Sequence, residues 1–228
     1  MGHDDLFHKK RRAREANDLE RPQRALQQQQ RILIVCEDSK SGAYYFQDMA
    51  EGFGLSAVDV LGKQCDSAPV SVVKYAVQTY EQELPSDPYD RVYCVFDRDQ
   101  HDSFDSAIQR ISNLRASGKP FFPITSTPCF EFWLLLHFKF VAHPYMPTGK
   151  RSPCDQTCSD LKTENEWQGY DKGSRKIYAK LAGEKTEVAI KNAKRLLKEN
   201  EKSSSKNPET YVHELVEFLS SLSLHKPM

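Results

Sequence analysis

The sequence predicts an α/β fold with a mostly parallel four-stranded sheet, flanked by helices and extended by an added C-terminal helical part. Short apolar runs rich in β-forming residues alternate with segments of helical periodicity, which is typical of such sheets. Residues 32–36 and 92–96 are apolar at every position, as in strands buried on both faces of a parallel sheet. Both runs end abruptly in acidic residues. A chain of 228 residues has room for one such domain and appended helices.

The alternation of strands and helices is expected to continue to residue 124. Pro69 suits the first turn of a helix, and Gly52 and Gly54 mark the end of another. Pro120 and Pro123 favour an edge position or irregular pairing for the last strand. The expected strands span residues 32–36, 57–61, 91–96 and 120–124. The expected helices between them span residues 43–53, 69–85 and 103–116.

The alternation of strands and helices is expected to stop after residue 125. Residues 126–138 are almost wholly apolar, and Pro128 fits a helix that begins there and is buried on most sides. Residues 142–172 are expected to form a loop, and two helices then close the chain. The first carries the stripe Ala189, Ile190, Ala193, Leu196 and Leu197. The second is expected to start at Asn207-Pro208-Glu209 and to bury Val212, Leu215, Val216, Leu219 and Leu222.

These elements suggest three parts: a basic, partly disordered arm at 1–30, a core at 31–140, and a loop with C-terminal helices packed on that core at 141–228. Lysine plus arginine equals aspartate plus glutamate, so the net charge identifies no partner. Residues 1–31 carry a net +3 (eight basic, five acidic) and residues 174–206 a net +6 (ten basic, four acidic). Either stretch suits an anionic partner or is simply a solvated helix face.

No apolar run approaches the length of a membrane span, and the charged N-terminus is unlike a signal peptide, so a cytoplasmic protein is expected. The cysteines fit reduced thiols in that compartment. Cys154 and Cys158, with His143 upstream, match zinc-site spacings only weakly. The other cysteines considered, in apolar surroundings where they act as small buried side chains, are Cys36, Cys94 and Cys129.

The acids that end the two apolar strands are the main functional candidates. In open parallel sheets ligands bind outside the carboxyl ends of the strands, so Glu37, Asp97 and Asp99 are expected at one edge. Three acids repel one another unless a cation lies among them, and Mg²⁺ (or Mn²⁺ in its place) prefers carboxylate oxygens. An Asp-x-Asp alone is usually a solvated turn; Glu37 at the end of a second apolar strand favours the metal site.

Three further side chains are considered with this group. Lys40 is either a phosphate-binding cation or a solvated lysine at the entry to a helix. Arg98 is expected to point away from the acids by strand alternation. Glu131 lies in an apolar run and needs a partner, a metal or the dipole of a helix N-terminus, whereas His137 is read as a core histidine.

Taken together, these segments resemble the RloB-like family. The resemblance lies in Ile32-Leu-Ile-Val-Cys-Glu37, Tyr44-Tyr-Phe46, Val92-Tyr-Cys-Val-Phe-Asp97-Arg-Asp99, Thr127-Pro-Cys-Phe-Glu131-Phe-Trp-Leu-Leu-Leu-His-Phe138, Ala189-Ile-Lys-Asn-Ala-Lys194 and Asn207-Pro-Glu-Thr-Tyr-Val212. It covers about residues 30 to 220. It implies a Toprim-like domain in which Glu37 is the general acid/base and Asp97 and Asp99 bind magnesium. It also implies anti-phage defence by abortive infection, often beside a restriction system or a partner ATPase.

The chain departs from the family pattern at two places. The family usually reads Glu-Gly-Glu-Lys-Thr-Glu after the first strand, whereas this chain reads Glu37-Asp-Ser-Lys40-Ser-Gly42 and so loses the last acid. The family's Ser-Asn-Pro is Ser126-Thr127-Pro128 here. Both departures leave the core of Glu37, Asp97 and Asp99 in place.

The first functional hypothesis is a magnesium-dependent nuclease, the effector of a defence system, which hydrolyses RNA or DNA. Its candidate catalytic residues are Glu37, Lys40 and Glu131, and its candidate metal ligands are Glu37, Asp97 and Asp99. The alternative is a non-catalytic sensor or regulatory subunit of a partner ATPase. A primase-like nucleotidyl transferase is a third reading, because the same site chemistry serves it.

Overall fold

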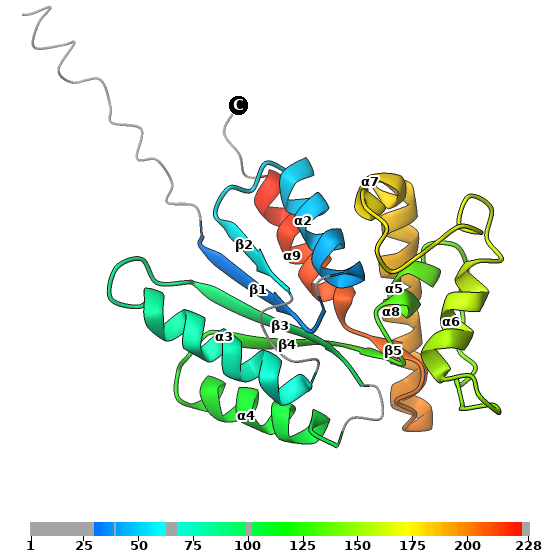
Figure 1. Ribbon diagram of the computed structural model, residues 1–228, viewed down its shortest axis with the longest axis horizontal. Coiled ribbons are helices and arrows are strands. Elements are labelled where there is room, and N and C mark those ends of the chain that lie inside the picture. Colours follow the sequence, from blue (N-terminus) through cyan, green and yellow to red (C-terminus); the bar gives the residue numbers. More distant parts are fainter. Residues whose placement is uncertain (1–29, 39, 63–67, 99–101, 225–228) are drawn as a thin grey trace, which may run out of the picture. The chain divides into compact units, whose positions relative to one another are not determined.

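The structure, a computed structural model, describes residues 30–38, 40–62, 68–98 and 102–224 (Figure 1). Residues from Arg31 onward fold as one compact unit around a five-stranded sheet. The strand order is β2-β1-β3-β4-β5, and every pair is parallel except β4 with β5. The strands are β1 (Ile32–Cys36), β2 (Val58–Leu61), β3 (Arg91–Asp97), β4 (Phe121–Thr127) and β5 (Glu209–Thr210). The predicted α/β class and mostly parallel sheet are confirmed, whereas the predicted number of four strands is wrong.

Strands β1 and β3 lie side by side in the sheet, with Ile34 opposite Tyr93 and Cys36 opposite Val95. Every residue of β1 is at most 1% exposed. Successive side chains enter different cores, since Ile34 belongs to one apolar cluster and Val35 to the other. The interpretation of these apolar runs as strands buried on both faces is therefore confirmed.

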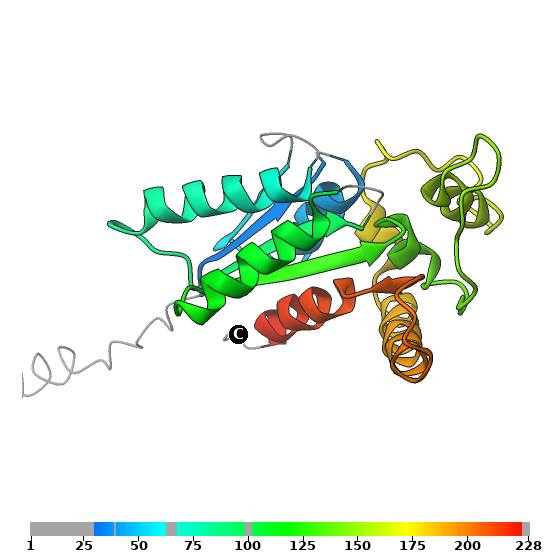
Figure 2. The same ribbon diagram turned by 90° about the horizontal axis from the view of Figure 1, so that it is seen from below.

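Helices cover both faces of the sheet. Helices α3 and α4 pack on one face, and α2 and α9 lie on the other (Figures 1 and 2). The described residues contain α2 (Ser41–Gly52), α3 (Pro69–Glu83), α4 (Phe104–Ala116), α5 (Glu131–Leu135), α6 (Pro153–Leu161), α7 (Ile177–Leu181), α8 (Glu184–Ser203) and α9 (Val212–Leu224). None of these helices is both long and apolar enough to cross a membrane.

Two expectations about helices are corrected in the middle of the chain. The apolar helix does not begin at Pro128, because β4 continues to Thr127 and α5 starts at Glu131. The stretch expected to be a loop contains α6. Its start is fixed by a capping box, in which the Ser152 side chain accepts from the Asp155 backbone N–H and the Asp155 carboxylate accepts from the Ser152 backbone N–H.

The start of the last helix is also corrected. Asn207-Pro208-Glu209 does not open a helix; Glu209 and Thr210 form β5, antiparallel to the end of β4, and α9 begins at Val212. The Asn207 side chain instead accepts a hydrogen bond from the Tyr145 backbone N–H and donates one to the Tyr145 carbonyl, so it is not available as a helix cap. The predicted apolar face of the helix is nevertheless buried at Val212, Leu215, Val216 and Leu219, with Leu222 partly buried.

The two polar residues of the apolar segment 126–138 are both buried. His137 is 3% exposed, its Nδ1 lies 3.0 Å from the Trp133 carbonyl oxygen, and burial lowers its pKa to about 4. A neutral histidine of this kind is part of the core, as expected. Glu131 is 1% exposed and belongs to the site described next.

Candidate active site

A cavity of about 340 Å³ lies at the carboxyl ends of β1 and β3. The chain passes from β1 to β2 on one side and returns to β3 on the other, so these two strands flank the point at which the strand order reverses. Open α/β sheets bind their ligands at such a point. The polar residues that line the cavity are Glu37, Asp38, Ser41, Asp97, Glu131, Ser152, Asp155 and Lys172.

Glu37 and Asp97 meet directly at this edge. The Glu37 backbone N–H donates to the Val95 carbonyl at 2.9 Å, which extends the pairing of β1 with β3 by one residue. The Asp97 backbone N–H donates to Glu37 Oε2, also at 2.9 Å. Two residues 60 apart in the sequence are therefore held together by the parallel pairing of their strands.

Acidic side chains are concentrated around Asp97 in the cavity. The pKa of Asp97 is raised well above its ordinary 3.8, first by burial and then by the carboxylates of Glu131 and Glu37. The Lys172 ammonium and the Phe130 backbone N–H act in the opposite direction. Burial likewise raises the pKa of Asp38. A cation among these carboxylates would relieve the repulsion that raises the pKa of Asp97.

Glu131 is the first residue of α5 and is buried with polar partners. Its Oε1 accepts from the Ser41 hydroxyl at 2.7 Å and from the Tyr170 hydroxyl at 3.0 Å. Its Oε2 lies 3.5 Å from Lys172 Nζ. The alternative in which the helix dipole alone holds this acid is therefore insufficient, because α2, α5 and the loop after α6 all contribute to its surroundings.

Lys172 is the cation that the sequence did not reveal. It lies in the loop between α6 and α7, where no periodicity or motif singles it out. Burial alone would lower its pKa, but the negative groups around it, Glu131 foremost, raise the pKa above its ordinary 10.5. Lys40 is exposed at the entry to α2 and is not among the residues that line the cavity.

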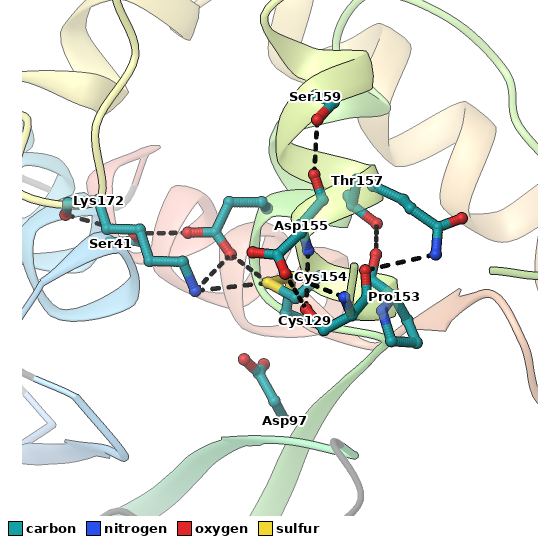
Figure 3. The surroundings of a disulfide bond; sticks show 12 residues. Ser41, Asp97, Cys129, Pro153, Cys154, Asp155, Thr157, Ser159 and Lys172 are labelled. Carbon is teal, nitrogen blue, oxygen red and sulfur yellow. Dashed lines mark hydrogen bonds and ion pairs between the residues drawn. A yellow bond between two sulfur atoms is a disulfide. The ribbon is translucent and has the colours of Figure 1, made fainter. Parts of the chain in front are cut away.

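A disulfide between Cys129 and Cys154 forms part of the cavity wall (Figure 3). It joins the turn before α5 to the first turn of α6 and corrects the expectation of reduced thiols for these two residues. Cys154 Sγ lies 3.4 Å from Lys172 Nζ. Figure 3 also shows the Asp97 side chain directed from the end of β3 toward the disulfide.

The cysteines also bear on the zinc alternative. Among the described residues, the ligand atoms of Cys129, Glu131 and Cys154 all lie within 4.8 Å of one another. This is a different set from the cysteine pair with His143 that the sequence suggested. Sulfurs joined to each other are not thiolate ligands, so the disulfide form does not suit zinc. Cys158 lies one turn further along α6, and burial raises the pKa of its thiol to about 12.

The disulfide is expected to stabilise the fold. It closes a separation of 25 residues, so its loss costs about 3 kcal/mol through the greater freedom of the unfolded chain. Urea unfolding of the oxidised protein with and without a phosphine reductant measures this difference. The variant Cys158→Ser is the matched control and should keep the full response to reductant, whereas Cys154→Ser should lose it. Equal midpoints for the wild type in both conditions would contradict this prediction.

The remaining predicted residues separate into two groups. Asp99 lies outside the described residues, and so does most of the basic arm. Arg98 turns away from the cavity, with its guanidinium carbon 5.1 Å from the centre of the Phe104 ring, which confirms the expected alternation. A side chain at Gly42 would contact the Phe130 ring at 3.5 Å, so the glycine that replaces the family's acid packs closely beside this site.

The fold and cavity define an α/β protein with a carboxylate-rich site at the reversal point of a mostly parallel sheet. Within this class the chain belongs to the RloB-like family, whose model, described as RloB-like protein, matches residues 32–219. The resemblance seen in the motifs is thereby confirmed. Neither the curated proteins nor the solved structures contain a match to this chain. The Toprim-like subtype and the roles of the acids stay predictions.

Proposed function

We propose that this protein is a magnesium-dependent nuclease that hydrolyses phosphodiester bonds of RNA or DNA. The observation that carries the proposal is the convergence of Glu37 and Asp97 from two parallel strands in one cavity with Glu131 and Lys172. Acids and a cation gathered at a strand-end cavity are the components that metal-assisted phosphoryl chemistry needs.

The donor set fits a hard divalent cation. Glu37 and Asp97 offer carboxylate oxygens. Burial and then the carboxylates of Glu131 and Glu37 raise the pKa of Asp97, and a cation beside it would favour its ionised form. Asp99, two residues further on, is proposed as a third ligand. When bound, Mg²⁺ or Mn²⁺ supplies charge neutralisation at phosphate oxygens and a more acidic bound water.

The protein's own side chains complete the site. Glu37 is proposed to accept a proton from the attacking water, because its Oε2 lies at the strand end beside Asp97. The Lys172 ammonium is proposed to stabilise negative charge on the phosphate oxygens, the role considered for Lys40. Glu131 is a positioning residue: it holds Lys172 at 3.5 Å while Ser41 and Tyr170 fix its other oxygen.

The biological setting is proposed from the family alone. Membership of the RloB-like family supports an effector role in anti-phage abortive infection, acting in the cytoplasm beside a partner ATPase. A nuclease that damages host nucleic acid would arrest an infected cell before phage are released.

The test is cleavage of labelled RNA and DNA by the purified protein in Mg²⁺, Mn²⁺ or EDTA. We expect metal-dependent cleavage that falls about 10²-fold or more in Glu37→Gln, since the amide retains an acceptor for the Asp97 N–H but is a poor base. Asp87→Asn is the matched control, because this acid pairs with Arg31 at the opposite end of the strands. It should cleave like the wild type.

The sensor alternative predicts a different outcome. A wild-type protein that cleaves neither nucleic acid in any metal, yet still protects cells when Glu37 is replaced, would overturn the nuclease proposal and favour a non-catalytic subunit of an ATPase. Cleavage that persists unchanged in Glu37→Gln would remove this residue from the mechanism. Nucleotide polymerisation in place of hydrolysis would favour the primase-like reading.

A further inference from the structure

A second cavity, of about 630 Å³, lies along the outer edge of β4, between α4 and α9. We call it the edge groove. Four basic side chains line it: Arg91 and Arg98 at the two ends of β3, Arg115 in α4, and Lys206 between α8 and β5. Arg98 directly follows Asp97 of the candidate active site, so this end of the groove lies one residue along the chain from that site.

The arginines of the edge groove stack on aromatic rings. The guanidinium carbon of Arg91 lies 4.4 Å from the centre of the Phe218 ring and 5.3 Å from that of Phe122. Arg115 lies over the same Phe122 ring at 5.2 Å. In the described part of the chain, neither Arg91 nor Arg115 forms a salt bridge with a carboxylate. Arg91 Nη1 also donates to the Tyr93 hydroxyl at 3.4 Å. Stacking orients each guanidinium and leaves its other N–H groups available to an anion.

Three acids also line the groove: Asp105, Glu209 and Glu214. Burial raises the pKa of Glu209 and of Glu214, with Arg98 and Arg115 opposing the shift at the respective glutamates. The four basic groups outnumber the three carboxylates. This charge balance favours an anionic occupant.

The aromatic rings give the groove an apolar surface. Tyr93 packs against Phe122 at 5.3 Å and against Phe218 at 5.7 Å between ring centres. Tyr93 is buried, whereas Phe122 and Phe218 are only partly buried. Aromatic rings and arginine planes together are the surface on which unpaired bases stack.

A peptide strand is a poorer occupant of this edge. The Tyr211 N–H donates to the Thr125 carbonyl, so the odd-numbered residues of β4 direct their backbone groups outward. Pro123 is one of these residues and has no N–H, and the Phe121 N–H already donates to Lys119. An added strand would therefore lack donors along the middle of the edge.

We propose that the edge groove binds single-stranded nucleic acid. Arg91, Arg98, Arg115 and Lys206 contact its phosphates, and its bases lie against Phe122, Phe218 and the arginine planes. A duplex keeps its base faces stacked inside and would use only the basic groups. Calling the bound strand a substrate rests on the proposed nuclease function. Binding in the edge groove itself does not require the acids of the candidate active site.

The test is fluorescence anisotropy of a labelled oligo-dT or oligo-U in EDTA, over a series of salt concentrations. The double variant Arg91→Gln/Arg115→Gln is expected to weaken binding at least tenfold. It should also reduce the slope of log affinity against log salt by about 1.4, or about 0.7 for each lost phosphate contact. Lys206→Gln, a change at an exposed residue, should reduce the slope by about 0.7 without affecting folding.

The matched control is Arg195→Gln. Arg195 also stacks on a phenylalanine, at 3.8 Å over Phe140, but it pairs with Glu199 and does not line the groove. It should bind like the wild type. Equal weakening by Arg195→Gln, no effect of either groove variant, or equal affinity for a duplex of the same length would overturn the proposal, as would preferential binding of an acidic peptide.

The binding measurement separates this proposal from the nuclease proposal. If the wild-type protein binds the oligonucleotide in EDTA but does not cleave it in any metal, the groove proposal is supported and the nuclease proposal is overturned. If the wild-type protein cleaves nucleic acid and the groove variants bind and cleave equally well, the nuclease proposal is supported and the groove proposal is overturned.

Discussion

Asp97→Asn is expected to abolish metal-dependent cleavage and, at the same time, to stabilise the metal-free protein. The activity should fall about 10²-fold or more, because the amide removes a charged metal ligand from the cavity. The stability should rise by about 0.5–2 kcal/mol at neutral pH, because the amide cannot ionise and so avoids the cost of desolvation and of repulsion by Glu131 and Glu37. A residue that lowers the stability of the fold is typical of a functional site.

The sign of the pH dependence follows from the raised pKa of Asp97. Above the ordinary pKa of 3.8 and below the raised native one, the folded wild type holds a proton that the unfolded chain has lost. This contribution to the free energy of unfolding is complete below 3.8 and is lost as the pH rises through the native pKa. The variant Asp97→Asn does not lose this contribution, so the difference between its free energy of unfolding and that of the wild type should grow with pH.

Urea unfolding of both proteins between pH 4 and 8, with EDTA or with Mg²⁺, measures these effects. Magnesium should raise the midpoint of the wild type and leave that of Asp97→Asn almost unchanged, since binding to the native state adds stability. Asp87→Asn, at the other end of the strands, is again the control. A less stable, fully active Asp97→Asn would contradict both the electrostatic account and the proposed metal site.

Trp133→Ala is expected to cause the largest loss of stability, about 3–5 kcal/mol. Trp133 is fully buried in α5, with its ring centre 4.8 Å from that of His137 and 6.4 Å from that of Tyr45. Its removal leaves a cavity beneath the segment that carries Glu131, so weaker cleavage should accompany the loss of stability.

Equilibrium unfolding in urea provides the measurement, and Trp167 remains as the fluorescent probe because the chain has two tryptophans. Trp133→Phe should cost less than Trp133→Ala, since it keeps most of the buried ring area. Leu84→Ala is the control: Leu84 is 47% exposed, and its loss should change the free energy of unfolding by no more than about 0.5 kcal/mol. A loss below 1 kcal/mol for Trp133→Ala would contradict the packing described here.

The sequence was most informative where structure follows from local pattern. Strands β1 and β3 were predicted to within one residue, because strands that are buried on both faces need apolar residues at every position. The parallel pairing of those strands then brings Glu37 beside Asp97, as expected from their positions at the carboxyl ends. Local signals failed at Asn207-Pro208-Glu209, where pairing with β4 overrode a pattern typical of a helix start.

By itself, therefore, the sequence determined the α/β class, the family, the acids at the strand ends and the burial of His137. The tertiary structure alone decided that Lys172 accompanies Glu131, that Cys129 bonds Cys154, and that three arginines line an edge groove. The physical reason is the range of the interactions. Periodicity and capping involve neighbouring residues and leave a pattern in the sequence, whereas a lysine 41 residues from its glutamate is placed by packing that no local pattern records.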